Sequence, residues 1–196
     1  MKATKWAQAN HRSQFILNGP RDGFSVVELL IVVAMLAVLT AVSMPIFAAT
    51  FKSSRFSGAA RQLSSDIRHA RSLAVSKGGF YGVHSGRDPF IADPALENSY
   101  RIEYSADGVT WPATTAAMGS PGVITNWQNL STQYTAVTVQ SVVNGSAAAI
   151  GGPIFNAMGA SVDLANAIRS VSITLADGSG TTKVIQISHA GNVKVP

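Results

Sequence analysis

The sequence has no cysteine, and only 13% of its 196 residues are charged. Without cysteine there is no disulfide, no thiolate ligand for zinc or an iron–sulfur cluster, and no cysteine nucleophile. Globular proteins usually have about 25% charged residues. Because 46% of this chain is apolar, it is neither a disordered tail nor a highly charged nucleic-acid arm. Its length allows one ordinary domain with an appended segment.

The net charge of +5 is unevenly distributed along the chain. Residues 1–79 contain ten of the fifteen Lys and Arg residues and three acidic residues, whereas residues 80–196 contain five basic and seven acidic residues. The mildly acidic C-terminal part argues against a nucleic-acid partner. The basic excess belongs to the N-terminal region.

The longest apolar stretch extends from Phe24 to Ala49 and contains the uninterrupted apolar run Leu29–Leu39. It is long enough to cross a bilayer, which takes roughly 20 mainly apolar residues. Lys and Arg flank it on both sides, and the denser N-terminal set predicts a cytoplasmic N-terminus and an exported, periplasmic C-terminal part. A buried core helix is the alternative.

A secretory signal peptide is another interpretation of this region, with Phe47-Ala48-Ala49 as a loose cleavage site. Two features count against it. The polar and basic stretch of residues 1–23 is long, and Glu28 lies among the apolar residues. A charge at the centre of a membrane costs about 2.5–3.5 kcal/mol, so Glu28 is a candidate functional residue.

The run Gly23-Phe24-Ser25-Val26-Val27-Glu28-Leu29-Leu30-Ile31 resembles the processing and methylation motif of type IV pilins and type II secretion pseudopilins. The resemblance implies that a prepilin peptidase removes residues 1–23 by cutting between Gly23 and Phe24, and then methylates Phe24. It implies insertion in the inner membrane as a single span and assembly with other pilins or pseudopilins through the N-terminal helix. It also implies that Pro45 bends or loosens that helix.

Physical chemistry gives Glu28 a role in assembly. Cleavage leaves an ammonium at Phe24, and a helix N-terminus favours a carboxylate one turn further on. In a helical stack of subunits, Glu28 of one subunit can face the ammonium of a neighbour and set the axial register. The alternative is a carboxylate solvated at the headgroup level. Pro45 has no N–H, so we expect a kink or local melting there.

The helix is predicted to continue beyond the membrane. We expect residues 24–51 to form its membrane half and residues 52–79 an amphipathic half that ends at Gly78-Gly79. The apolar face consists of Phe56, Ala60, Leu63, Ile67, Ala70 and Ala74. The opposite face carries Arg55, Arg61, Arg68 and Arg71, which we expect to be solvated.

Residues 80–196 are predicted to form a β-rich periplasmic domain. The expected strands are Phe80–His84, Ser99–Tyr104, Val123–Trp127, Gln133–Val143, Val171–Ala176 and Lys183–Ser188. The expected turns are Asp107-Gly108, Asp177-Gly178-Ser179-Gly180 and Ala190-Gly191-Asn192. The fold class is therefore α+β, with a long N-terminal helix packed on antiparallel sheets.

Three further segments resemble the GspH/FimT group of minor pseudopilins and minor pilins. They are Ala70-Arg71-Ser72-Leu73-Ala74, Gly152-Pro153-Ile154-Phe155 followed by Gly159, and Ile185-Gln186-Ile187-Ser188 followed by Gly191-Asn192-Val193. FimT-like proteins that capture DNA resemble one another in arginines near the C-terminus. Here Lys194 is the single basic residue of that region, a departure from the pattern of DNA uptake.

The sequence offers no catalytic constellation. His11, His69, His84 and His189 have no metal-ligand spacing, and Asp88, Asp93 and Glu97 do not follow a calcium loop. No Gly-x-Ser-x-Gly elbow is present. We therefore expect no enzyme, no metal and no cofactor. The leading hypothesis is a GspH-like minor pseudopilin of type II secretion. The alternatives are a FimT-like minor pilin of a type IV pilus, and an exported binding domain with an ordinary signal peptide.

Overall fold

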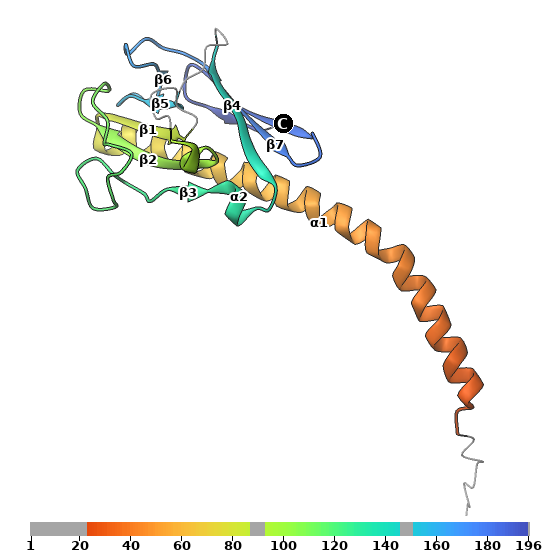
Figure 1. Ribbon diagram of the computed structural model, residues 1–196. Helices are drawn as coiled ribbons and strands as arrows, with labels where there is room; N and C mark the ends of the chain where they lie inside the picture. Colours follow the sequence, from red (N-terminus) through yellow and green to blue (C-terminus); the bar gives the residue numbers. More distant parts are fainter. Residues whose placement is uncertain (1–22, 87–92, 146–150, 196) are drawn as a thin grey trace, which may run out of the picture. The chain divides into compact units, whose positions relative to one another are not determined.

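The computed structural model describes residues 23–86, 93–145 and 151–195. His11, Asp88 and the expected leader before Gly23 lie outside the described residues. The chain divides into two compact units, residues 1–46 and 47–196. The helix α1, Val26–Lys77, begins in the first unit and ends in the second (Figure 1).

The part of α1 that belongs to the second unit buries the predicted apolar face. All six predicted residues, from Phe56 to Ala74, have at most 3% of their surface exposed. The helix ends at Lys77, where Gly78 donates its N–H to the carbonyl of Ala74 at 3.0 Å. Gly78 has a φ of 73° and Gly79 a φ of 87°, a conformation that glycine adopts at little cost. The predicted helix end is therefore confirmed.

The first sheet has the strand order β3-β2-β1-β5-β6 and is antiparallel throughout. Its strands are β1 (Phe80–Ser85), β2 (Ser99–Ser105), β3 (Gln128–Asn129), β5 (Ile154–Phe155) and β6 (Ser161–Val162). The 3-10 helix η1 (Pro94–Leu96) precedes β2, and the short helix α2 (Leu130–Gln133) follows β3. The longest pairing joins β1 and β2, with His84 opposite Arg101.

The second sheet has the order β4-β7-β8-β9 and is also antiparallel. It consists of β4 (Val137–Asn144), β7 (Val171–Asp177), β8 (Thr182–Ile187) and β9 (Val193–Lys194). The predicted hairpin of β7 and β8 is confirmed. At its turn the Asp177 carboxylate accepts the N–H groups of Ser179 and Thr181, each at 2.9 Å.

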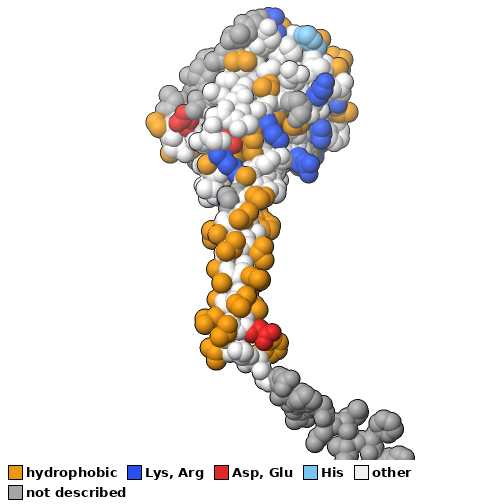
Figure 2. All heavy atoms as spheres, turned by 90° about the vertical axis from the view of Figure 1, so that its right-hand side faces the viewer, with side chains coloured by type: hydrophobic (Ala, Val, Ile, Leu, Met, Phe, Trp, Pro, Cys, Tyr) orange, Lys and Arg blue, Asp and Glu red, His pale blue; other side chains and the backbone are white. Residues whose placement is uncertain are grey.

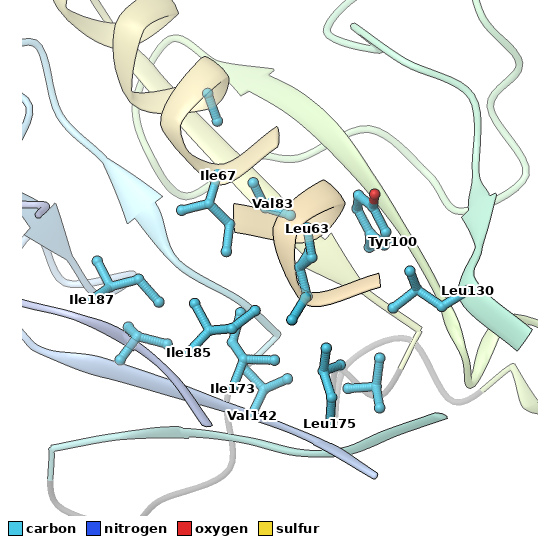
Figure 3. Packing of buried hydrophobic residues seen from close by; sticks show 14 of the residues in the cluster. Leu63, Ile67, Val83, Tyr100, Leu130, Val142, Ile173, Leu175, Ile185 and Ile187 are labelled. Atoms are coloured by element: carbon cyan, nitrogen blue, oxygen red, sulfur yellow. The ribbon is translucent and has the colours of Figure 1, made fainter. Parts of the chain in front are cut away.

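The hydrophobic core joins the helix to both sheets. Figure 3 shows Leu63 and Ile67 of α1 facing Ile173 and Ile185 of the second sheet. Val83, Tyr100 and Ile102 enter the same cluster from the first sheet. Alternate residues of β7, namely Val171, Ile173 and Leu175, are buried, as the period of a strand with one covered face requires. The predicted α+β class is confirmed.

Two predicted strands need correction. Residues 123–127 form no strand: Ile124 and Thr125 both donate their N–H to the carbonyl of Ile102, and the Thr125 hydroxyl accepts the N–H of Ile102. This side-chain bond replaces one bond of a regular ladder, and Val123 retains only an isolated bridge to Glu103. The strand predicted from Gln133 begins at Val137, because Gln133 ends α2.

The two-residue strands β3, β5, β6 and β9 were not predicted. Each is too short to show an alternating pattern in the sequence. They are formed through pairing with longer or neighbouring strands, β5 with β1 and β9 with β8.

Replacing Ile67 by alanine tests the packing of α1. Ile67 is fully buried, so we expect the free energy of unfolding of the second unit to fall by about 2–5 kcal/mol. The matched control is Ser65→Ala on the exposed face of the same helix, where we expect a change within about 0.5 kcal/mol. Urea unfolding of the full chain in detergent measures both. An equal loss in the two variants would contradict this packing.

Candidate functional site: the exposed apolar helix

The helix α1 begins at a capped and accessible N-terminus. Gly23, Phe24 and Ser25 precede the helix and are exposed. The Ser25 hydroxyl accepts the N–H of Val27 at 3.3 Å, and the Ser25 carbonyl accepts the N–H of Leu29 at 3.1 Å. Ser25 is thus the N-cap. The peptide bond between Gly23 and Phe24 lies outside the helix, in the extended or irregular backbone that a protease can bind.

Nothing in the described structure requires glycine at position 23. A Cβ there would meet no atom within 4 Å, and Gly23 is not among the glycines with positive φ. Glycine has a physical reason where φ is positive or where a neighbour approaches closely. Neither reason applies to Gly23 within the described residues.

The first part of α1 exposes its apolar side chains on every side. Large hydrophobic residues from Val26 to Ile46 are 48–78% exposed, and Figure 2 shows hydrophobic side chains along the visible face of this segment. Among the described residues, α1 is the one helix long and apolar enough to cross a membrane, judged by length and composition. Such an exposed apolar surface marks a site of association with a partner or a membrane.

The two hydroxyl side chains of this segment bond within the helix. Thr40 donates to the carbonyls of Leu36 and Ala37, both at 2.9 Å, and Ser43 donates to the carbonyl of Leu39 at 2.8 Å. Their hydrogen-bonding capacity as donors is therefore met without water. This arrangement suits an apolar environment, where an unmet donor costs several kcal/mol.

Glu28 is the single charged side chain among residues 23–46. It lies in the first turn of α1 and is exposed. The partial positive charge of the helix N-terminus favours a carboxylate at this position. An apolar surface with one exposed anion can select the angle and axial position of a partner, because a misplaced partner leaves the charge uncompensated. The assembly role of Glu28 remains a prediction.

The assignment of α1 continues through Pro45 without a break. Proline cannot donate to the carbonyl of the preceding turn. The bend or loosening expected at Pro45 remains a prediction, as do the cleavage after Gly23 and the methylation of Phe24.

The predicted solvated face of arginines is wrong for Arg71. Its Nε donates to the carbonyl of Gly159 at 3.0 Å, one terminal nitrogen donates to the carbonyl of Ala190 at 2.9 Å, and the other lies 3.4 Å from the Asn192 amide oxygen. The planar guanidinium fits these diverging acceptors. Arg68 also bonds a C-terminal carbonyl, that of Val193, at 3.3 Å, whereas Arg55 and Arg61 are exposed as predicted.

The Arg71 contacts explain the GspH/FimT-like segments physically. Gly159 and Gly191 both have a φ of 75°. A Cβ on Gly191 would lie 2.1 Å from the Gly159 carbonyl oxygen and 2.8 Å from Nε of Arg71. The three segments converge on one close contact that has no room for larger residues.

The second unit also buries a polar cluster that the sequence analysis did not identify. His84, Arg101 and Glu103 are at most 5% exposed. Nε of Arg101 donates to the Glu103 carboxylate, and Nε2 of His84 lies 3.9 Å from the other Glu103 oxygen. The alternation of Arg101 and Glu103 with Tyr100 and Ile102 could have indicated that these charges share one face of a strand.

No metal site is found among the described residues. Residues 23–86, 93–145 and 151–195 contain no group of three or more His, Asp or Glu side chains placed to hold an ion. Asp93 accepts the N–H of Ala95 at 2.9 Å and caps η1. The predictions that the chain binds no cofactor and is no enzyme remain predictions.

The chain resembles known proteins in structure, whereas comparisons of its sequence give no match. No protein-family model matches the chain, and no curated protein matches it in sequence. The solved structures that it resembles include one minor pilin in two crystal forms and one minor pseudopilin.

One is the type IV minor pilin FimU of Pseudomonas aeruginosa, with a TM-score of 0.47 and 17% identity over 74% of this chain and 90% of that one. Its second crystal form gives a TM-score of 0.44 and 16% identity, over 71% and 91% of the two chains. Another is the minor pseudopilin EpsH of the Vibrio cholerae type 2 secretion system, with a TM-score of 0.48 and 10% identity over 72% of this chain and 96% of that one. Identities and TM-scores this low do not assign a function to this chain.

Replacing Arg71 by alanine tests the contact between α1 and the C-terminal segment. The loss of charge-assisted bonds to two carbonyls should lower the free energy of unfolding by about 1.5–3 kcal/mol. Arg61→Ala is the matched control, since Arg61 is exposed on the same helix, and should change it by about 0.5 kcal/mol or less. Thermal unfolding by circular dichroism distinguishes the two. If both variants unfold like the parent chain, the Arg71 contacts do not stabilise the C-terminal segment.

Proposed function

We propose that this chain is a minor pseudopilin of a type II secretion system, processed by a prepilin peptidase and assembled at the tip of a periplasmic pseudopilus. The observation that carries the proposal is the exposed apolar segment of α1 with its single carboxylate, Glu28. A filament subunit needs such an exposed apolar helix in two successive environments. The inner membrane covers it before assembly, and neighbouring helices cover it afterwards.

The start of α1 supports processing between Gly23 and Phe24. That bond is exposed and lies outside the helix, and no described contact requires glycine at position 23. Cleavage there makes Phe24 the N-terminus, two residues before the first helical residue, Val26. The new ammonium is then four residues, about one helical turn, before the Glu28 carboxylate.

The domain division predicted from the sequence is part of this proposal. Residues 1–23 are the leader, residues 24–51 the membrane half of the helix, residues 52–79 its amphipathic half and residues 80–196 the periplasmic domain. The N-terminus faces the cytoplasm in this arrangement. The domain holds the chain at the outer side of the membrane, where it contacts other pseudopilins.

A FimT-like minor pilin of a type IV pilus is the second candidate, and it would use the same helix in the same way. The C-terminal region gives a reason to place it second. Lys194 is the single basic residue after Lys183, so this end offers few cations for DNA.

Intact-mass analysis of the chain purified from membranes tests the processing. We expect a polypeptide that begins at Phe24 and carries one N-methyl group. Gly23→Val should block cleavage, because the added side chain would enter the peptidase site, while Asp22→Ala should leave it intact. A mature N-terminus near Ala49 would refute the proposal and favour an ordinary signal peptide.

Glu28→Gln tests assembly separately from insertion, because it removes the charge and keeps the shape. We expect normal membrane insertion but about tenfold less incorporation with partner subunits, which corresponds to ~1.4 kcal/mol. Ser43→Ala on the same apolar segment is the control and should assemble normally. Co-isolation of the chain with cross-linked neighbours measures incorporation. Unchanged incorporation of Glu28→Gln would show that the charge has no role in assembly.

A further inference from the structure

Positive charge begins where the apolar stretch of α1 ends. Residues 29–51 contain no charged side chain, and Lys52 follows them directly. On the face shown in Figure 2, the exposed apolar helix carries no Lys or Arg side chain. Since roughly 20 mainly apolar residues cross the hydrocarbon of a bilayer, a span formed by this stretch has Lys52 at its outer end.

Two exposed phenylalanines lie directly before this charge. Phe47 and Phe51 are each 60% exposed, and their ring centroids are 6.5 Å apart. Residues four apart share one face of a helix. Neither ring is among the residues of the hydrophobic core. Exposed apolar rings next to cations are typical of a surface that lies at the boundary between hydrocarbon and headgroups.

The cations next to these rings come from two elements that are far apart in the sequence. Lys52 and Arg55 lie on α1 and are exposed. Lys183 lies on β8, where its Nζ donates to the Ser57 hydroxyl at 2.8 Å and lies 5.4 Å from the centre of the Phe56 ring. Lys183 is thereby held against the same part of α1. Lys52, Arg55 and Lys183 together form what we call the basic collar.

The depth of the basic collar matches that of a headgroup layer. Along α1 the collar extends from Lys52 to Ser57, the residue that binds Lys183. Five helical steps of about 1.5 Å give ~7.5 Å. A bilayer about 40–45 Å thick with a hydrocarbon core of ~30 Å has a headgroup layer of about 5–8 Å on each side. All three cations therefore lie within the depth of one layer of lipid phosphates.

One carboxylate offsets part of this charge. Oδ2 of Asp177, in the turn between β7 and β8, lies 3.9 Å from Nζ of Lys52, and the Asp177 side chain is 9% exposed. Arg55 makes no hydrogen bond or ion pair with any residue that the structure describes, and it is exposed. Three cations against one carboxylate leave an excess of two positive charges. The basic collar can therefore bind an external anion.

Cations on the outer side of a span require an explanation. Membrane proteins carry most of their Lys and Arg near a span on the cytoplasmic side, whereas the basic collar lies on the opposite side in the proposed topology. Anionic phospholipids place negative charge at this depth and attract nearby Lys and Arg. An acidic protein would supply the charge, but not the hydrocarbon boundary that the rings of Phe47 and Phe51 fit.

We propose that the basic collar binds the headgroups of anionic phospholipids at the outer surface of the membrane, with Phe47 and Phe51 at the boundary to the hydrocarbon. This binding rests on the membrane span of the proposed function and adds a lipid partner to it. Because Lys52 lies against Asp177, the turn between β7 and β8 lies at the lipid surface as well. The second sheet therefore contacts the membrane at this end.

Spin-labelled lipids test this binding. The full chain is reconstituted in phosphatidylcholine bilayers with a trace of spin-labelled phosphatidylglycerol or phosphatidylcholine, and electron paramagnetic resonance gives the fraction of each lipid that the protein immobilises. We expect the preference for phosphatidylglycerol to be about two to five times higher in the parent chain than in Lys52→Gln/Arg55→Gln, because each cation near the surface attracts anionic lipid. The control Arg61→Gln/Lys194→Gln removes the same charge from exposed positions outside the collar and should keep the parent's preference.

The outcomes separate this binding from the proposed function. If both lipids are immobilised but Lys52→Gln/Arg55→Gln keeps the parent's preference, the span exists and the collar does not bind lipid. An equal loss in the control variant would show a general effect of charge and would also overturn the proposal. If neither lipid is immobilised, the chain does not insert, and the membrane span fails together with the collar. An unchanged lipid preference with weaker co-isolation of partner subunits would identify an acidic protein as the occupant instead.

Discussion

The apolar side chains between Val26 and Ile46 find no cover among the described residues, whereas the later part of the same helix buries its apolar face under two sheets. One helix therefore has one part that is covered by the sheets and another part that no described residue covers. Covering apolar surface is favourable by about 25 cal/mol for each Å². Association of the exposed part of α1 with a partner or a membrane is therefore strongly favoured.

In the proposed assembly, Glu28 limits how the exposed segment of α1 can be covered. A purely apolar helix can be covered by lipid or by another helix in many registers at similar cost. A carboxylate at one end makes most of these registers unfavourable, because the charge has to remain hydrated or meet a cation. The same residue thus lowers the affinity of the helix for the bilayer interior and raises the specificity of a helical partner.

The sequence predicted the helix and its buried face well, because the spacing of Phe56, Leu63 and Ile67 follows the helical period. It predicted the β7–β8 hairpin because alternation and a glycine-rich turn occur together there. It failed at residues 123–127, where one hydroxyl, that of Thr125, takes the place of a backbone acceptor. Such a bond depends on a strand residue 23 positions away in the chain, which no local pattern shows.

The Arg71 contact has a consequence for the order in which the protein acquires its native state. Its acceptors at Ala190 and Asn192 are 119 and 121 residues further along the chain. Residues this distant are synthesised well after α1, and closing so long a loop costs chain entropy before the bonds compensate for it. During translation the Arg71 guanidinium therefore lacks its acceptors at Ala190 and Asn192 until that segment has been synthesised.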